Sequence, residues 1–306
     1  MNLVIVESPA KAKTINKYLG SDYIVLASYG HVRDLPSKNG SVDTEHDFKM
    51  IWEIDPGSKK HLKEITDCAI DAERIILATD PDREGEAIAW HLKCILEENK
   101  KIKDKKFERV VFNEITKKAV DNGISNPRDI NPELVNAYMA RRALDYLVGF
   151  NISPILWTKL PGSKSAGRVQ SVALRIIVDR EHDIELFKPQ EYWTFACTFL
   201  TQQKKELNAR LYSFKGNKIE KFSFKNEQEI KNVLEQIKKE SFNIASIDKK
   251  PYRRSPYAPF TTSTMQQEAS KKLGFSASRT MQIAQRLYQG IDFEGDTVGL
   301  ITYMRT

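Results

Sequence analysis

The sequence has few cysteines and no long apolar run. Only three of its 306 residues are cysteine, and Cys68, Cys94 and Cys197 lie far apart without a Cys-x-x-Cys pair. This spacing argues against disulfides and against a cysteine zinc site, and we interpret all three as ordinary core residues. No apolar stretch reaches the roughly 18 to 20 residues of a membrane span, and the N-terminus lacks the layout of a signal peptide. We therefore expect a soluble, cytoplasmic protein with no membrane partner.

The sequence also lacks a balance of charge. It carries 48 Lys and Arg against 41 Asp and Glu, a formal net charge of +7, and its pI is about 9.1. This excess favours a polyanionic partner, but it does not choose between DNA, RNA and an acidic membrane surface. Many of the lysines fall in runs such as residues 99–106, which are typical of solvated faces. The placement of the arginines is therefore more informative than the total.

The first 120 residues alternate between strand-like and helix-like patterns. Strands are expected at residues 3–7, 23–28, 75–80 and 108–112, and helices from about residue 10 and over residues 59–72. Residues 30–57 are rich in turn formers and are expected to form a loop or a small excursion. This order predicts an α/β layer with a mostly parallel sheet.

The chain changes character from about residue 132. Residues 132–149 are expected to form an amphipathic helix with Pro early and Gly late, and a second helix follows Gly167. Residues 192–247 mix β-like runs, such as 193–199, with a helix around 227–239. A turn-rich linker over residues 250–259 leads to helices near 262–272 and 277–289 and to a last β-like run, 298–303. A length of 306 residues with these shifts predicts two or more domains.

One stretch, residues 75–86, joins a strand-like run to three acidic residues. The apolar run predicts a buried strand that delivers Asp80 to its carboxyl end, where α/β folds place their chemistry. Helical spacing begins at Asp82, so Asp80, Asp82 and Glu84 crowd one strand-to-helix corner. Oxygen ligands of this kind suit a hard cation such as Mg²⁺. Acids are also common in the first turn of ordinary helices, so this motif needs support from elsewhere in the chain.

That support comes from the first strand. The apolar run at residues 3–6 ends in Glu7, and Ser8, Pro9 and Lys11 follow at the start of a helix. If the two strands are neighbours in a parallel sheet, Glu7 and Lys11 meet the acidic corner at one edge. Such a site could handle phosphodiesters with Mg²⁺.

Basic and aromatic residues of the middle segment could contact nucleic acid. Arg141 and Arg142 lie beside Asp145 within one helical turn, and residues 163–170 form a small-residue loop that opens a helix. Free helical amides, hydroxyls and a guanidinium make a phosphate cradle, although each feature alone also fits a salt bridge or a cap. Trp157 could stack on an unpaired base, and core packing is the ordinary alternative for such a residue. His31, in a loop just past a strand, could touch DNA.

The last run of the chain, residues 299–306, contains a candidate nucleophile. In an extended segment Tyr303 and Arg305 would point the same way. A tyrosine can attack a phosphodiester and keep the bond energy in a phosphotyrosine link, but its usual pKa of about 10 means that it needs help with deprotonation. Arg305 and Lys11 could stabilise the charged transition state. Without such context a tyrosine in an apolar run is a core residue.

Read together, these motifs resemble bacterial type IA DNA topoisomerases over essentially the whole chain. Tyr-Met-Arg-Thr at residues 303–306, rather than Tyr-Pro-Arg-Thr, resembles the topoisomerase I branch more than the topoisomerase III branch. Several motifs in the right order are far more specific than any one of them. They are residues 6–12, 80–86, 112–116, 140–142, 165–171, 255–270 and 299–306.

The resemblance implies a Toprim domain that holds Mg²⁺ through Glu7, Asp80 and Asp82, with Glu84 nearby. Tyr303 would be the nucleophile that forms a 5′-phosphotyrosine bond on one DNA strand, and Glu7, Lys11 and Arg305 would be the other catalytic residues. Negative supercoils would be relaxed by strand passage and religation without ATP. The positions implied to contact single-stranded DNA are His31, Arg141, Arg142, Asp145, Trp157, Ser165, Ala166, Gly167, Arg168, Val169, Gln170 and Arg305.

The resemblance also divides the chain into four parts. These are a Toprim domain (1–131), a helical DNA-binding segment (132–191), a β-rich arch segment (192–255) and a partial domain carrying the nucleophilic tyrosine (256–306). The fold class is therefore an α/β Toprim domain with a mostly parallel sheet, followed by mixed α+β segments of an incomplete ring. We expect a monomer.

One departure from the family concerns the end of the sequence. Family members continue well beyond the tyrosine, whereas this chain stops three residues after Tyr303. We therefore expect a truncated chain that does not relax plasmid DNA by itself. Three alternatives stay open: another Toprim enzyme such as a primase or nuclease, a non-catalytic fragment that binds single-stranded DNA, and a topoisomerase III-like decatenase.

Overall fold

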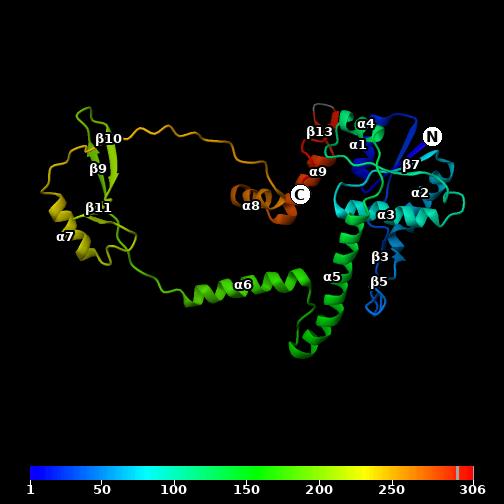
Figure 1. The fold of residues 1–306 in the computed structure, drawn as a ribbon, viewed down its shortest axis with the longest axis horizontal. Helices are drawn as coiled ribbons and strands as arrows, with labels where there is room; N and C mark the ends of the chain where they lie inside the picture. The colour runs from blue at the N-terminus through cyan, green and yellow to red at the C-terminus, as the bar shows by residue number, and fades with distance from the viewer. Residues whose placement is uncertain (294–295, 306) are drawn as a thin grey trace. The chain divides into compact units, whose positions relative to one another are not determined.

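A parallel four-stranded sheet forms the centre of the N-terminal part of the computed structural model, which describes residues 1–293 and 296–305. The strand order is β2 (Tyr23–Ala27), β1 (Asn2–Val6), β7 (Arg74–Leu77) and β8 (Phe107–Arg109), and all three pairings are parallel. Strand β7 is labelled in Figure 1, near the N-terminus of the chain. The predicted α/β layer is confirmed. Strand β1 lies inside the sheet, so Leu3 to Val6 are completely buried, and continuous apolar runs are what such strands require.

Helices cover both faces of this sheet. Leu3, Ile5, Ile75 and Leu77 face one apolar core together with helices α2 (Lys59–Asp71) and α3 (Arg83–Glu97). The alternate residues, among them Val4 and Ile76, face a second core with α1 (Pro9–Leu19), α4 (Lys117–Ser125) and α9 (Ala277–Gln289). Successive strand residues point to opposite faces, so one strand contributes to both cores.

The turn-rich segment after β2 is a small excursion with short strand pairs. Strand β3 (Arg33–Asp34) pairs with β6 (Glu53–Ile54), and β4 (Val42–Asp43) pairs with β5 (Lys49–Met50), all antiparallel. A 3₁₀ turn, Pro56–Ser58, then leads into α2.

Helix α5 is longer than the sequence predicted. It runs from Pro132 to Lys159, through Gly149 and Pro154, so the expected end near Gly149 is wrong. A single glycine weakens a helix by only about 1 kcal/mol, and apolar residues continue beyond it. Helix α6 (Arg168–Leu186) follows, with the predicted start after Gly167. No helix of residues 1–293 and 296–305 is long and apolar enough to cross a membrane.

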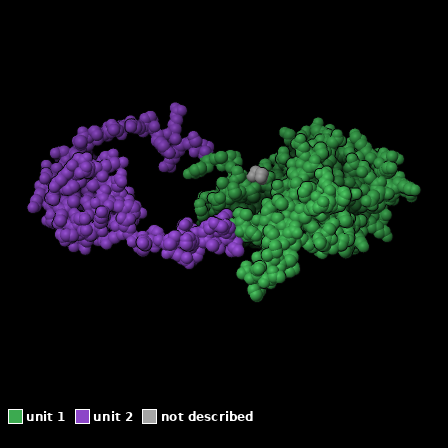
Figure 2. Space-filling model, turned by 60° about the horizontal axis from the view of Figure 1, so that its bottom comes forward, with its two compact units in different colours: residues 1–172, 257–306 green, residues 173–256 purple. Residues whose placement is uncertain are grey.

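The chain divides into two compact units, residues 1–172 with 257–306, and residues 173–256 (Figure 2). The second unit has a small core of its own around Phe224, Ile230 and Val233. Its strands are β9 (Ala196–Leu200), β10 (Glu206–Arg210), β11 (Ser213–Phe214) and β12 (Asn217–Lys218), and its helix is α7 (Glu227–Ile237). The β-like run predicted at 193–199 is a strand only from Ala196. The four-part division of the chain stays a prediction.

The C-terminal segment returns to the first unit. It contains α8 (Thr262–Leu273), α9 and a hairpin of β13 (Ile291–Phe293) and β14 (Asp296–Val298). The β-like run predicted at 298–303 is wrong beyond Val298, because residues 299–305 form no strand. The Gly299, Leu300 and Tyr303 amides instead donate to carbonyls of Ile115, Leu287 and Asn113. The Gly299 and Tyr303 contacts therefore fix the segment against the loop between β8 and α4.

Candidate active site

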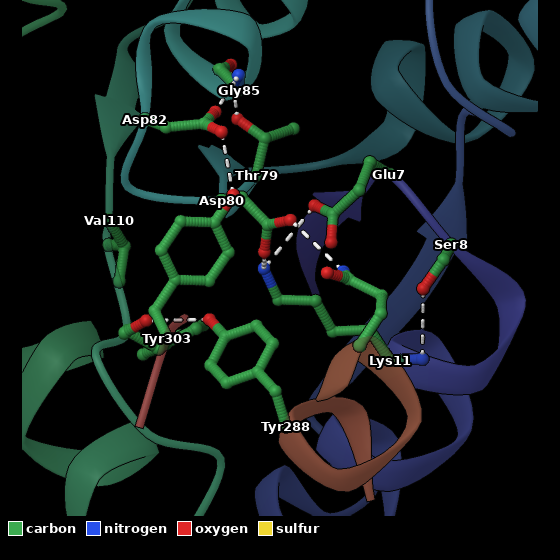
Figure 3. A network of polar contacts seen from close by, with 12 residues as sticks. Glu7, Ser8, Lys11, Thr79, Asp80, Asp82, Gly85, Val110, Tyr288 and Tyr303 are labelled. Atoms are coloured by element: carbon green, nitrogen blue, oxygen red, sulfur yellow. Dashed lines mark hydrogen bonds and ion pairs between the residues drawn. The ribbon is translucent and has the colours of Figure 1, made fainter. Parts of the chain in front are cut away.

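The carboxyl ends of β1 and β7 bring Glu7, Lys11 and Asp80 together. The two strands are adjacent and parallel, with Ile5 opposite Leu77. The Lys11 Nζ lies 3.3 Å from Glu7 Oε2 and 3.1 Å from Asp80 Oδ1 (Figure 3). The prediction that Glu7, Lys11 and Asp80 meet at one edge of the sheet is confirmed. Helix α1 positions the lysine, since the Ser8 side chain caps its first turn through the Lys11 amide.

Burial sets the protonation behaviour of this group. The Lys11 side chain is fully buried, and its two ion-pair partners are the carboxylates of Glu7 and Asp80. Burial raises the pKa of Glu7 to about 7, with Lys11 opposing the rise and Asp80 adding to it. One oxygen, Glu7 Oε1, is buried without a hydrogen-bond partner among the described residues. Glu7 can therefore hold or release a proton near neutral pH.

Asp82 connects the acidic corner to the C-terminal segment. Its Oδ1 accepts the Gly85 amide at 2.8 Å and so caps α3. Its Oδ2 accepts the Tyr303 hydroxyl at 2.7 Å (Figure 3). The same oxygen accepts Arg305 Nη1 at 3.0 Å. Burial raises the pKa of Asp82, but these hydrogen bonds outweigh burial and bring the pKa below its usual value. Tyr303 and Arg305 do point the same way, as predicted, although no strand holds them.

The Tyr303 phenol is a protonated group in this setting. Burial raises its pKa far above the ordinary value, and the negative charges of Asp80 and Asp82 raise it further. The Tyr288 ring packs edge-on against it at 5.0 Å, and the Tyr288 hydroxyl donates to the Phe112 carbonyl at 2.6 Å. The ring of Tyr303 is thus held firmly, and any reaction at its oxygen needs a group that takes the proton.

A buried arginine shapes the strand-to-helix corner. Arg109 is enclosed and donates to the carbonyls of Leu77, Thr79, Asp80 and Val110 at 2.5–3.0 Å, and its Nε donates to Glu86 at 3.0 Å. The same corner leaves no room at Gly85, where an added Cβ would lie 2.1 Å from the Asp80 carbonyl oxygen. The backbone that carries Asp80 and Asp82 is therefore fixed from behind.

The remaining acid, Glu84, pairs with a predicted DNA-contact residue. His31 Nε2 lies 3.3 Å from Glu84 Oε2, and the His31 ring stacks on Tyr138 of α5 at 5.4 Å. A hydrogen bond from His31 lowers the pKa of Glu84. His31, Glu84 and Arg141 all line one cavity of about 1130 Å³ with Glu7, Asp80, Asp82 and Arg305.

Another part of the cavity lining consists of uncharged polar residues that were not predicted from the sequence. It includes Gln266 of α8 and Ser278, Gln282 and Gln285 of α9. Gln285 Nε2 donates to Asp80 Oδ2 at 3.3 Å. Ser278, Gln282 and Gln285 are spaced by four and then three residues, so they lie on one face of α9. This spacing of polar residues could have been read from the sequence.

The other predicted DNA-contact residues lie apart from the acids. Arg142 makes a two-pronged pair with Asp34 at 2.7 Å for each contact, and Arg168 Nε contacts Asp145 at 2.9 Å. Arg142, Asp145, Trp157, Ser165 and Ala166 line a second cavity of about 670 Å³. Gly167, Arg168, Val169 and Gln170 are not among the residues that line either cavity. The structure thus separates the predicted contacts into two groups.

The four predicted metal ligands are engaged with protein partners. No three His, Cys, Asp or Glu side chains of residues 1–293 and 296–305 are arranged to hold a metal ion. Asp82 is turned toward Tyr303 and Arg305, and Glu84 toward His31. Glu7 and Asp80 nevertheless fit a divalent cation, because both converge on one positive group and Glu7 Oε1 lacks a donor. The complete ligand set stays a prediction.

Comparison with known proteins defines the class first. The profile described as "Toprim domain" matches residues 2–115, and Toprim domains bind a divalent metal ion. The profile described as "DNA topoisomerase" matches residues 129–306, more than half of the chain. The chain therefore belongs to the bacterial DNA topoisomerase family, of the type IA class.

Individual relatives agree with this assignment. The protein called DNA topoisomerase 1 in Rickettsia bellii is 55% identical over all of this chain, which covers 38% of that protein. The protein of the same name in Zymomonas mobilis is 54% identical, with 24% of its length covered. The solved structure of full-length topoisomerase I from Thermotoga maritima matches with a TM-score of 0.80 at 39% identity, over 100% of this chain and 49% of that one. The chain spans about two fifths of the length of the Rickettsia relatives.

Proposed function

We propose that this chain carries the DNA cleavage and religation centre of a type IA topoisomerase, with Tyr303 as the nucleophile. The observation that supports this most directly is the 2.7 Å hydrogen bond from the Tyr303 hydroxyl to Asp82. This bond joins a phenol of the C-terminal segment to Asp82 of the Toprim domain, and Asp82 lines a cavity together with Glu7, Asp80 and Arg305. In the complete enzyme the reaction would relax negatively supercoiled DNA.

Each bond change in the proposed cleavage has a residue beside it. The Tyr303 oxygen bonds to phosphorus as the bond from phosphorus to the 3′ oxygen breaks, and the phenolic proton leaves along its hydrogen bond to Asp82. Glu7, with its pKa of about 7 caused by burial, can give a proton to the departing 3′ oxygen. Arg305 and Lys11 offset the negative charge of the transition state. The reverse sequence reseals the strand.

The cation and the energy source follow from the same chemistry. A divalent ion held by Glu7 and Asp80 would supply positive charge at the reacting phosphate. We propose Mg²⁺, because the available ligands are carboxylate oxygens. The covalent phosphotyrosine preserves the energy of the broken bond, so the reaction does not need ATP, and supercoiling drives the strand passage.

The second cavity is the proposed path of the single strand beyond the cleavage site. Arg142 and the loop at 165–170 offer positive charge and hydroxyl groups for phosphates. Trp157, with 57% of its surface exposed, offers a ring for stacking. His31 and Arg141, which line the first cavity, would contact the strand nearer the reacting phosphate.

The proposal is tested by trapping a covalent adduct. The 306-residue protein is incubated with single-stranded DNA labelled at its 3′ end, in Mg²⁺ or in EDTA, and quenched with denaturant. We expect a labelled protein band in Mg²⁺, none in EDTA, and none with Tyr303→Phe. Tyr257→Phe, at a fully exposed position, is the matched control and should keep the band.

The alternatives give different results. An adduct that survives in Tyr303→Phe would contradict the assignment of the nucleophile and would favour another Toprim chemistry. Ordinary salt-dependent DNA binding with no adduct would favour a binding segment instead of a cleavage centre.

A further inference from the structure

An exposed aromatic pair stands next to the proposed active site. Tyr29 lies two residues after the end of β2, and 57% of its surface is exposed. Its ring stacks on His61 of α2 with centroids 3.8 Å apart and planes 22° apart. His61 covers one face of the tyrosine ring, and no other ring of the described residues contacts it. The exposed area therefore belongs largely to the opposite face.

The backbone at Tyr29 is held in an unfavourable conformation. Its φ is +60°, in the left-handed region that residues with a bulky side chain rarely adopt. The side chain is more than half exposed, so burial offsets only part of this cost, which is of order 1–3 kcal/mol for such outliers. Exposed aromatic residues also lose favourable burial. Two unfavourable features at one residue suggest that the ring serves a ligand.

The pair lies immediately outside the catalytic cavity. The Ser28 amide donates to the Val6 carbonyl at 2.8 Å, and the Gly30 amide donates to the Glu7 carbonyl at 3.0 Å. Tyr29 is thus held between two backbone contacts with the strand that carries Glu7. Its neighbours Gly30 and His31 line the cavity, so a strand leaving the cavity on this side would meet the ring.

The helix behind the pair carries positive charge where helices usually carry negative charge. Helix α2 begins with Lys59 and Lys60, Lys63 follows His61 by two residues, and its first turn has no acid. Cations at a helix N-terminus oppose the helix dipole and cost stability. All three lysines are exposed, and none makes an ion pair with a residue in the ranges 1–293 and 296–305. They are available to phosphates.

We propose that Tyr29 and His61 form a stacking platform for an unpaired base of the DNA strand bound in the cavity, with the lysines of α2 contacting its phosphates. This inference rests on the proposed function, because that function supplies the single-stranded DNA. Aromatic stacking combined with a basic surface is the general mode of binding single strands without sequence preference.

The test compares matched variants on two kinds of strand. Tyr29→Gly removes the ring and suits the left-handed backbone, so its Tm should stay level or rise. Tyr29→Phe keeps the ring. Phe48→Gly is the control, because Phe48 is also aromatic, has φ +52° and is 52% exposed, but no ring within residues 1–293 and 296–305 stacks on it. Binding is measured in EDTA by the anisotropy of a dye-labelled oligodeoxyadenylate and of an abasic strand of equal length.

We expect Tyr29→Gly to bind the oligodeoxyadenylate about 5-fold to 150-fold more weakly than wild type, as loss of one stacked base would cause. Tyr29→Phe and Phe48→Gly should bind within about twofold of wild type, and all proteins should bind the abasic strand alike. If Tyr29→Gly bound each strand as tightly as wild type does, the stacking platform would be overturned. An equal loss on the abasic strand would overturn it as well. Adduct formation is scored separately with Tyr303→Phe, so failure of the cleavage proposal is distinguishable.

Discussion

At the scale of single residues, Glu7 is a buried carboxylate that lies next to the Lys11 ammonium group and the Asp80 carboxylate. Burial raises its pKa to about 7, so the folded protein holds a proton that the unfolded chain releases near its usual pKa of 4.5. Raising the pH through this window therefore lowers the free energy of unfolding, and the effect is complete above the folded pKa.

Glu7→Gln should remove this pH dependence. In EDTA, the free energy of unfolding of the variant minus that of wild type should increase between about pH 5 and 7.5, by up to about 3 kcal/mol. Urea unfolding at several pH values measures the difference. Glu64→Gln, at an exposed position of α2, is the control and should follow wild type in parallel. A constant difference for Glu7→Gln across the range would contradict the account of Glu7.

Gly85 provides a prediction about close packing. Gly85→Ala places a methyl group 2.1 Å from the Asp80 carbonyl oxygen, so the corner has to move. We expect a loss of more than about 2 kcal/mol in stability and loss of the adduct. Gly149→Ala, in the interior of α5 with no atom within 4 Å of the new Cβ, should instead gain about 0.5–1 kcal/mol. Thermal unfolding compares the two, and similar effects would refute the steric argument.

Among the residues that lie together at the candidate site, the sequence singled out the acids and did not single out the residues of α9. Glu7, Asp80 and Asp82 follow from strands that end in acids, and alternation alone placed Tyr303 and Arg305 on one side. Gln285 and Tyr288 lie on a helix that was recognised, but only packing decides which face of that helix meets the acids. The hydrogen bond between Tyr303 and Asp82 joins residues far apart in the chain, and no local pattern encodes it.

At the scale of elements, the turn between β7 and α3 depends on a buried ion pair. Arg109 and Glu86 both have fully buried side chains, and the pair holds the carbonyls that precede Asp82. Glu86→Gln leaves the guanidinium without its counter-charge, so we expect a loss of about 3–5 kcal/mol. Glu97→Gln on the same helix, in an exposed pair with Lys93, should cost about 0.3–0.5 kcal/mol. Urea titration of both variants measures the contrast, and similar losses would contradict a structural role for the buried pair.

The bounds of helices were predicted well where apolar residues recur at a clear helical period. They were predicted less well where tertiary contacts determine the local structure. Helices α2, α8 and α9 begin and end within one residue of the predicted bounds. Helix α5 continues past Gly149 because its apolar pattern continues, which outweighs a single glycine. Residues 299–303 have a β-like composition, but the Gly299, Leu300 and Tyr303 amides donate to carbonyls of a loop and of α9 instead of a neighbouring strand. Arg109, in an apolar run that predicts a strand, gave no sign that it would be buried.

At the scale of the whole molecule, the C-terminal segment should stay bound to the N-terminal layer after proteolysis. Residues 187–195 and 241–260 contain no helix or strand and are the expected cleavage sites. Helix α9 and its neighbours contact the layer through Tyr288 to Phe112, Thr14 to Gln289 and Tyr18 to Thr297. After limited proteolysis, fragments from both ends should co-elute in gel filtration.

Ala284→Glu is the matched disruption for this experiment. Ala284 is buried in the core shared by α9 and the sheet, so a carboxylate there should release the C-terminal fragment. Separation of the wild-type fragments would contradict the description of residues 1–172 and 257–306 as one unit.

The class of the whole molecule was predictable, and the strand order was not. Alternating strands and helices gave the parallel α/β layer, because crossover connections impose it. The order β2-β1-β7-β8 depends on which buried runs pair, and several short apolar strands could exchange places without changing the pattern.

The central claim is that Tyr303 attacks DNA at a 5′ phosphate, and the polarity of the adduct tests it most directly. DNA carrying a label at its 3′ end or at its 5′ end is cleaved in Mg²⁺, and the protein is then digested and mapped by mass spectrometry. We predict that the 3′ label stays with the protein, that the 5′ label leaves on a fragment with a free 3′ hydroxyl, and that the DNA is attached to the peptide containing Tyr303. Retention of the 5′ label, or attachment to another residue, would contradict the account.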